Sequence, residues 1–321
     1  MSKKYLFLVI SLVICSLCCL WASYQYLDKQ KELNVRGQYT FIKTLENMES
    51  LSAVRLISPQ GREINIYYDN GVWKMKEAAG YFISPEMLKK LYNMFNNSII
   101  TDIFPADHAI SRNLTAYTQT KEKDSATGMQ IKTFSSDGSL LDDVIIGGEN
   151  KHLKQHYAKY TNGHASYLIS SAGGIMANAT LWLPSPLLRI DYILVNGLQI
   201  GDKKVAEDDL DTLIMNSPSL QKTFYALQHI DFQDIIRSED FFKAYPDIQA
   251  KEIVFYLRDG LRFELKLYYE ENTYFLQIKA DTELVSKRRA ASFVREHKKF
   301  YDGWIFVIDD TIGKLLSEME L

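Results

Sequence analysis

Apolar residues follow two different patterns along this chain. One uninterrupted apolar run begins at Tyr5 and ends at Ala22, directly after Lys3 and Lys4, whereas apolar and polar residues are interspersed through the rest. A helix of that length extends about 27 Å, which matches the hydrocarbon thickness of a bilayer. The pattern therefore predicts a transmembrane anchor at residues 5–22, a cytoplasmic tail at residues 1–4 and a juxtamembrane stalk at residues 23–50.

A cleaved signal peptide is the main alternative to a permanent anchor, and it requires small residues at the first and third positions before the cut. Cleavage after Ala22 would place Leu20 at the third position, and cleavage after Ser23 would place Trp21 there. We therefore expect an uncleaved, single-pass anchor. The short N-terminal tail and the long body favour a cytoplasmic N-terminus and an extracytoplasmic body, since long domains translocate largely regardless of charge.

Beyond the anchor, alternating apolar and polar residues flank tight turns, which is the sequence signature of β-hairpins. Ser84 and Pro85 provide an N-cap and a first helical residue, and they predict a helix that ends near Asn96. The first half is thus predicted to be a meander that carries one helix. Its predicted hairpins cover residues 64–75, 129–146 and 157–170, with turns at Asn70-Gly71, Asp137-Gly138 and Asn162-Gly163.

The second half repeats this order of signals. Ser217 and Pro218 begin a second predicted helix, residues 234–236 repeat the pattern of residues 102–104, and Asp259-Gly260 marks a further hairpin. Such self-similarity is typical of an internal repeat. The sequence predicts an α+β fold with two similar modules of antiparallel hairpins, each carrying a helix, at residues 51–183 and 184–321. Chance recurrence of hairpins and capped helices is the alternative.

Composition places the body among ordinary folded proteins, with 46% hydrophobic and 24% charged residues. The formal net charge of -3 gives no indication of nucleic-acid binding. All three cysteines lie within the anchor, so the body has neither a disulfide framework nor a thiol nucleophile. The sequence also contains no phosphate-binding loop, dinucleotide fingerprint or nucleophile elbow. We therefore expect no cofactor and no catalytic activity.

Three of the six histidines, His152, His156 and His164, lie within thirteen residues. If residues 151–157 were helical, His152 and His156 would share a face and could ligate zinc, although His164 lies beyond the Asn162-Gly163 turn. The alternative, which we favour, is a set of polar side chains on an exposed hairpin.

Two surfaces are candidates for binding a partner. A basic cluster in a predicted C-terminal helix could dock on anionic lipid or on an acidic protein, and a solvated helix face is the alternative. Tyrosine pairs that include Tyr68 and Tyr269 direct one ring to each side of a strand, which suits a binding platform, and ordinary sheet packing is the alternative. The basic cluster consists of Lys287, Arg288, Arg289, Arg295, His297, Lys298 and Lys299.

A set of apolar and turn positions, spread over most of residues 51–190, carries a family resemblance. The set comprises residues 54–75 with Gly71-x-Trp73, the Ser84-Pro85 helix, the Asp137-Gly138 hairpin, residues 167–169, and Trp182 followed by residues 187–190. It resembles an uncharacterised bacterial domain-of-unknown-function family of membrane-anchored proteins, and the second half resembles it more weakly. Members are often encoded beside ABC-type transporters and auxiliary proteins similar to those of gliding motility. The resemblance implies a transporter-associated protein of the bacterial cytoplasmic membrane with its body on the periplasmic side, and it supplies no catalytic residues.

Taken together, the sequence favours a non-catalytic accessory or binding protein of a transport or envelope assembly. Its expected partners are the bilayer and proteins of that assembly, and self-association is left open. The alternative is an enzyme or ligand-binding protein that acts on envelope polymers through a carboxylate site that spacing does not identify. A binding module predicts broad apolar or aromatic surface, whereas an enzyme predicts convergent acids in a cleft.

Overall fold

A computed structural model of the chain describes residues 23, 40–43, 50–104, 128–150, 152–163, 165–170, 177–282 and 288–321, and of residues 207, 208, 288 and 289 it describes the backbone only. The predicted tail and anchor, and most of the predicted stalk, lie outside these residues. Among the helices of the described ranges, none is long and apolar enough to cross a bilayer.

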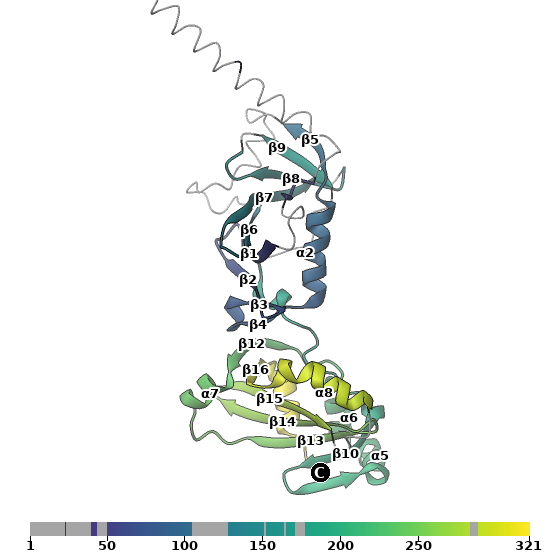
Figure 1. The fold of residues 1–321 in the computed structure, drawn as a ribbon. Helices are drawn as coiled ribbons and strands as arrows, with labels where there is room; N and C mark the ends of the chain where they lie inside the picture. The colour runs from purple at the N-terminus through teal and green to yellow at the C-terminus, as the bar shows by residue number, and fades with distance from the viewer. Residues whose placement is uncertain are drawn as a thin grey trace, which may run out of the picture. The chain divides into compact units, whose positions relative to one another are not determined.

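The described residues form an α+β fold with two antiparallel sheets and seven α-helices (Figure 1). The sheets contain nine and seven strands. The described residues divide into two compact units: those within residues 1–63 and 88–177 form the first, and those within residues 64–87 and 178–321 form the second. The predicted module boundary after residue 183 stays a prediction, and the sequence did not indicate that residues 64–87 belong to the second unit.

The first unit is built around six strands in the order β1-β6-β7-β8-β9-β5. One face of its helix α2 (Pro85–Asn97) is buried through Leu91, Met94 and Phe95, which recur at helical spacing. This helix and the hairpins confirm the elements predicted for the first half. The strands are β1 (Leu51–Ile57), β5 (Ile100–Phe104), β6 (Met129–Ser135), β7 (Leu140–Asn150), β8 (Gln155–Tyr160) and β9 (Ser166–Ser170).

The core of the first unit begins before residue 51. Phe41 and Ile42, which lie in the predicted stalk, are completely buried. The Phe41 ring lies 4.7 Å from the Tyr160 ring and 5.3 Å from the Tyr167 ring, and its backbone amide donates to the carbonyl of Ser98 at 2.6 Å. Residues 40–43 are therefore part of the folded unit.

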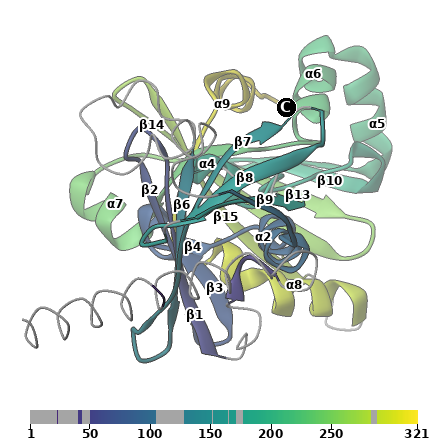
Figure 2. The same ribbon diagram turned by 90° about the horizontal axis from the view of Figure 1, so that it is seen from above.

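The second unit contains a seven-stranded sheet in the order β11-β10-β13-β14-β15-β16-β12. Helix α7 lies at one side of this sheet, and α5 and α6 lie at the opposite side (Figures 1 and 2). The strands are β10 (Val195–Ile200), β11 (Lys203–Ala206), β12 (Phe232–Arg237), β13 (Lys251–Leu257), β14 (Leu261–Glu270), β15 (Thr273–Thr282) and β16 (Trp304–Ile308). The helices are α4 (Ala179–Trp182), η4 (Tyr192–Leu194), α5 (Glu207–Asn216), α6 (Pro218–Ala226), α7 (Ser238–Ala244), α8 (Arg288–Tyr301) and α9 (Asp310–Ser317).

Residues 64–87 contribute a meander to the second unit. It consists of β2 (Glu63–Asp69), β3 (Val72–Met75), the short helix η2 (Lys76–Ala78) and β4 (Tyr81–Phe82). Asn70 and Gly71 both have positive φ, of 51° and 84°, as the predicted two-residue hairpin turn requires. Tyr81 is 1% exposed, and its ring lies 5.1 Å from Trp304 and 5.8 Å from Phe306. This aromatic contact explains why the meander belongs to the second unit.

Six strands of the second sheet, β10-β13-β14-β15-β16-β12, follow the same order as the six strands of the first unit. Irregularities in strand pairing also occur at corresponding positions of the two halves. A register shift follows the first residue of β1, at Leu51, and another follows the first residue of β10, at Val195. Further shifts precede Asp102 in β5 and Asp234 in β12, and each of these carboxylates accepts the amide of the next residue.

Caps and turns correspond as well. The hydroxyl groups of Ser84 and Ser217 each accept a backbone amide three residues along, at 3.4 and 3.3 Å. In the hairpin turns, Gly138 and Gly260 have φ of 84° and 86°. The amide of Leu187 donates to the carbonyl of Ile230 before β12, as that of Phe41 does to Ser98 before β5. The two halves therefore agree in strand order, strand irregularities, turns and helix starts.

Candidate functional site

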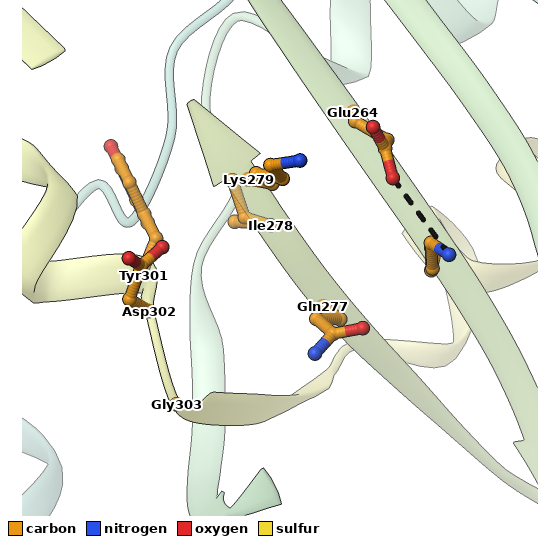
Figure 3. Close-up of a pocket in the computed structure, with 8 residues that line it drawn as sticks. Glu264, Gln277, Ile278, Lys279, Tyr301, Asp302 and Gly303 are labelled. Carbon is orange, nitrogen blue, oxygen red and sulfur yellow. Dashed lines mark ion pairs between the residues drawn. The ribbon is translucent and has the colours of Figure 1, made fainter. Parts of the chain in front are cut away.

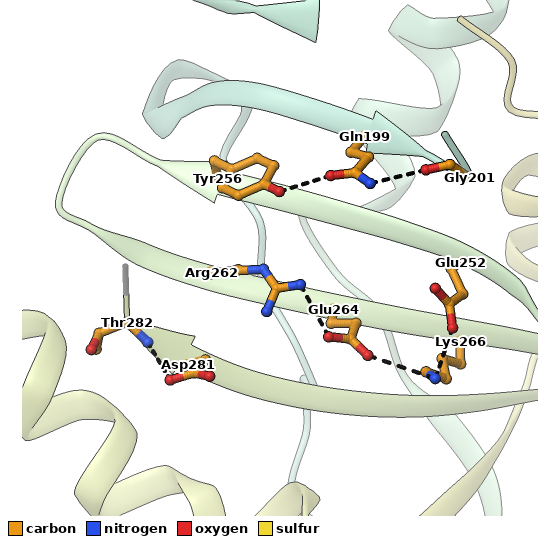
Figure 4. A network of polar contacts seen from close by, with 9 residues as sticks. All are labelled: Gln199, Gly201, Glu252, Tyr256, Arg262, Glu264, Lys266, Asp281 and Thr282. Carbon is orange, nitrogen blue, oxygen red and sulfur yellow. Dashed lines mark hydrogen bonds and ion pairs between the residues drawn. The ribbon is translucent and has the colours of Figure 1, made fainter. Parts of the chain in front are cut away.

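Strand β14 carries a row of charged side chains on one side of the second sheet. Its residues alternate, so that Phe263 and Leu265 are buried while Arg262, Glu264 and Lys266 lie on the other side. An Arg262 guanidinium nitrogen lies 3.2 Å from Glu264 Oε2, and Lys266 Nζ lies 3.8 Å from Glu264 Oε1 (Figure 4). Glu264 thus lies between two cations on its own strand.

The polar surface extends to β13 and β10. Lys266 Nζ lies 2.7 Å from Glu252 Oε1, and this hydrogen bond raises the pKa of the Lys266 ammonium group. The Tyr256 hydroxyl donates to Gln199 Oε1 at 2.9 Å (Figure 4), and Lys204 Nζ lies 3.9 Å from the centre of the Tyr256 ring. The result is a fixed polar network across neighbouring strands.

A pocket of about 270 Å³ adjoins this network where β15 and the residues after α8 separate (Figure 3). Two carboxylates and two ammonium groups line it, and the carboxylates have cations nearby: Lys266 for Glu264, and Lys298, at 3.6 Å, for Asp302. Such an arrangement suits the binding of a polar ligand. The lining residues are Glu264, Lys266, Gln277, Ile278, Lys279, Tyr301, Asp302 and Gly303.

The buried hydroxyl group of Tyr301 makes the stability of the protein depend on pH. Burial raises the pKa of its hydroxyl group from 10.0 to about 12, and the hydroxyl donates to the carbonyl of Leu187 at 3.3 Å. Because the folded pKa lies above the unfolded value, the folded state retains the proton between these values, and stability falls as pH rises from about 10 to about 12. The contribution that is lost amounts to about 2 to 3 kcal/mol.

We therefore expect Tyr301→Phe to lose less stability than the unaltered protein between about pH 9 and about pH 12. Urea midpoints of the purified full-length chain at several pH values measure this difference. The same substitution at Tyr225, which is 78% exposed, serves as the control and should leave the pH dependence unchanged. If Tyr301→Phe and the unaltered chain lost the same amount of stability between these pH values, burial of the Tyr301 hydroxyl group would not explain the pH dependence.

The predicted histidine group does not share a helix face. His152 lies in the turn between β7 and β8, and His156 lies in β8, where its Nδ1 is 3.3 Å from the carbonyl oxygen of Gly147. His164 lies outside the described residues. Within the described parts of the chain, no cluster of three or more His, Cys, Asp or Glu side chains is arranged to hold a metal ion.

The predicted basic cluster lies largely in α8. Arg295, Lys298 and Lys299 are exposed, while His297 stacks on Phe293 with ring centres 4.1 Å apart. Lys299 also lies over the Phe300 ring, at 5.2 Å. Lys287 is outside the described residues, and Arg288 and Arg289 begin the helix with side chains that are not described. The described cations are thus exposed, and Phe293 and His297 form a stacked, half-buried pair on the same helix.

The two candidate tyrosines are exposed at strand positions. Tyr68 is 50% exposed and lies 5.5 Å from the Trp73 ring, and Tyr269 is 53% exposed and lies 4.6 Å from the Tyr274 ring. The neighbour of Tyr269, Tyr268, is 4% exposed, as strand alternation requires. Neither exposed ring lines the pocket described above.

Sequence reasoning did not identify the pocket or the charged row. The signal was present, because residues 261–267 alternate strictly between apolar and charged side chains. It also missed the successive exposed side chains of η4, which follow the buried residues Leu187, Leu188 and Ile190. Comparison of the chain with protein-family models, with curated proteins and with solved structures found no match.

Proposed function

We propose that this chain is a membrane-anchored, extracytoplasmic binding protein that assists a transport or envelope assembly without catalysing a reaction itself. The apolar run at residues 5–22 supports the anchor, and the family resemblance described above supports the setting beside an ABC-type transporter. The observation that carries the binding role is the exposed apolar surface of the second unit. That surface is of the kind that protein partners bury.

The central part of this surface is η4, which presents three successive apolar side chains. Tyr192, Ile193 and Leu194 are 46%, 59% and 45% exposed. Their backbone is fixed, because Asp191 caps the turn and the carbonyl of Leu194 accepts the amide of Arg258 at 2.8 Å. A partner would bury these side chains with little ordering cost, and full burial of each large apolar side chain contributes about 1.5 to 3 kcal/mol.

We also propose that the two halves of the body, whose six strands follow the same order, arose by internal duplication. The shared strand order, the register shifts at corresponding positions and the matching serine caps support this origin. After duplication, one copy can retain the fold while the other acquires a contact surface. The exposed residues of η4 lie in the second half, directly before β10, and residues 44–49 before β1 lie outside the described ones.

The test is photocrosslinking in native membranes of the bacterium that makes the protein. A photoreactive amino acid replaces Ile193, Tyr68 or Tyr269 in the full-length chain, one position at a time, and mass spectrometry identifies the captured species. We expect the same subunit of an ABC-type transporter, or of its auxiliary proteins, to be captured from at least the Ile193 position.

The control places the photoreactive residue at Lys243, an exposed position of α7. It should capture the partner weakly or not at all. Capture of only lipid or of the chain itself from all three test positions would contradict the accessory role. The self-captured product would instead indicate an oligomer.

A further inference from the structure

We propose that the pocket beside β15 binds one sugar unit of an uncharged saccharide. This inference goes beyond the partner-binding role, which rests on other residues. It rests on three features of the pocket: hydrogen-bond donors with unused capacity, acceptors with unused capacity, and a charge balance that disfavours ions of either sign.

The donors come from β15. Gln277 and Lys279 pair directly with Lys266 and Glu264 of β14, which places all four side chains on the same side of the sheet. Gln277 Oε1 accepts the Tyr268 hydroxyl at 3.1 Å, which fixes the amide and leaves its NH₂ group to donate. Lys279 makes no ion pair with any residue that the structure describes.

The acceptors are two carboxylates from different elements. Glu264 Oε2 accepts from Arg262, whereas its Oε1 is 3.8 Å from Lys266 Nζ, beyond hydrogen-bond length. Asp302 extends from the segment after α8, and its Oδ2 lies 3.6 Å from Lys298 (Figure 3). Each carboxylate therefore keeps an oxygen that can accept a hydrogen bond from a ligand.

The charges select an uncharged ligand. An anion would gain from Lys266 and Lys279 but would meet Glu264 and Asp302, and a cation would meet the reverse arrangement. A hydroxyl group both donates and accepts hydrogen bonds. A polyhydroxylated ligand can therefore hydrogen-bond to both ammonium groups and both carboxylates without bringing an unpaired charge into the pocket. The volume of about 270 Å³ lies just below the range of roughly 300 to 1,000 Å³ for drug-sized ligands, which fits a single sugar unit.

Gly303 lines the pocket with backbone atoms only. Its φ is +81°, and a Cβ atom at this position would meet no other atom within 4 Å. The chain therefore turns from α8 into β16 without a side chain that would fill the pocket. A longer saccharide could continue past this point while one unit stays in the pocket.

The test is saturation-transfer NMR on the full-length chain in nanodiscs, with four related probes at equal millimolar concentration. Glucose and N-acetylglucosamine are uncharged, glucuronate is an anion and glucosamine is a cation. We expect saturation transfer to both uncharged sugars and weaker transfer to both charged ones. No transfer to either uncharged sugar, or a preference for a charged one, would overturn the inference.

The double variant Lys279→Met with Asp302→Ala locates the site. It removes one charged donor and one charged acceptor, and the loss of each such hydrogen bond lowers affinity about tenfold or more. Lys314→Met, which alters an exposed lysine of α9 outside the pocket, is the matched control and should bind as the unaltered chain does. Equal binding by the double variant, with an unchanged thermal midpoint, would place any sugar elsewhere. Crosslinking from Ile193 remains a separate readout of the proposed partner binding.

Discussion

Replacing Tyr81 with alanine is expected to lower the free energy of unfolding of the second unit by about 3 to 5 kcal/mol, the cost of removing a large buried aromatic side chain. The ring is 1% exposed and contacts the rings of Phe232, Trp304 and Phe306 at 5.9, 5.1 and 5.8 Å. Its deletion would leave a cavity among aromatic groups that cannot collapse freely. Urea unfolding of the purified full-length chain, followed by tryptophan fluorescence, measures the loss.

Two further variants separate the effect of losing the buried ring from the loss of its hydroxyl hydrogen bond and from the loss of an exposed tyrosine. Tyr81→Phe keeps the ring and removes only the hydrogen bond from the hydroxyl to the carbonyl of Phe300, at 2.9 Å, so we expect a loss of about 1 kcal/mol. Tyr92→Ala alters a tyrosine of α2 that is 40% exposed and should change stability by about 0.5 kcal/mol or less. Equal effects of Tyr81→Ala and Tyr92→Ala would show that the meander is not part of the second core.

Gly313→Ala is expected to destabilise the second unit although alanine is the better helix former. Gly313 lies within α9, where Gly→Ala would ordinarily stabilise by about 1 kcal/mol. Here a Cβ atom would lie 2.1 Å from Cγ of Tyr274, so the helix and β15 would have to separate. Overpacking of this kind costs about 1 to 3 kcal/mol, and chemical denaturation of the variant measures the sign directly.

A double variant and a matched glycine test this explanation. Tyr274→Ala removes the obstructing ring but keeps its Cβ atom, which would lie 2.5 Å from the added Cβ. Adding Gly313→Ala to Tyr274→Ala should therefore cost less than Gly313→Ala costs alone, but should still destabilise. Gly148→Ala introduces a Cβ atom that meets nothing within 4 Å and should leave stability nearly unchanged. An increase in stability for Gly313→Ala in the unaltered background would refute the steric argument.

Local structure could be predicted from the sequence because neighbouring residues determine it. The serine caps at Ser84 and Ser217 and the glycine turns at Gly138 and Gly260 depend on contacts within a few residues, and each occurs where the sequence predicted it. The repeated order of these signals also led to the two-module interpretation, with which the matching strand orders agree.

Long-range pairing could not be predicted in the same way. Strand β1 pairs with β6, which is separated from it in sequence by α2 and four other strands, and no local pattern indicates that pairing. The pocket depends likewise on the distant residues Asp302 and Gly303 approaching β15. The alternation of residues 261–267 is a sequence signal for a polar side of β14 that the sequence analysis did not use, and which other elements leave that side open depends on tertiary packing.

Because the second unit is built from two separate segments of the chain, its core cannot form until the second segment has been synthesised. Tyr81 and its hydrogen-bond partner Phe300 are 219 residues apart in sequence. At a synthesis rate of about 5 to 20 residues per second, the Tyr81 ring leaves the ribosome about 10 to 45 s before Phe300 does. Throughout that interval the meander lacks its aromatic neighbours Trp304 and Phe306 of β16, so a truncated chain that ends before β16 would expose an apolar surface to chaperones and proteases.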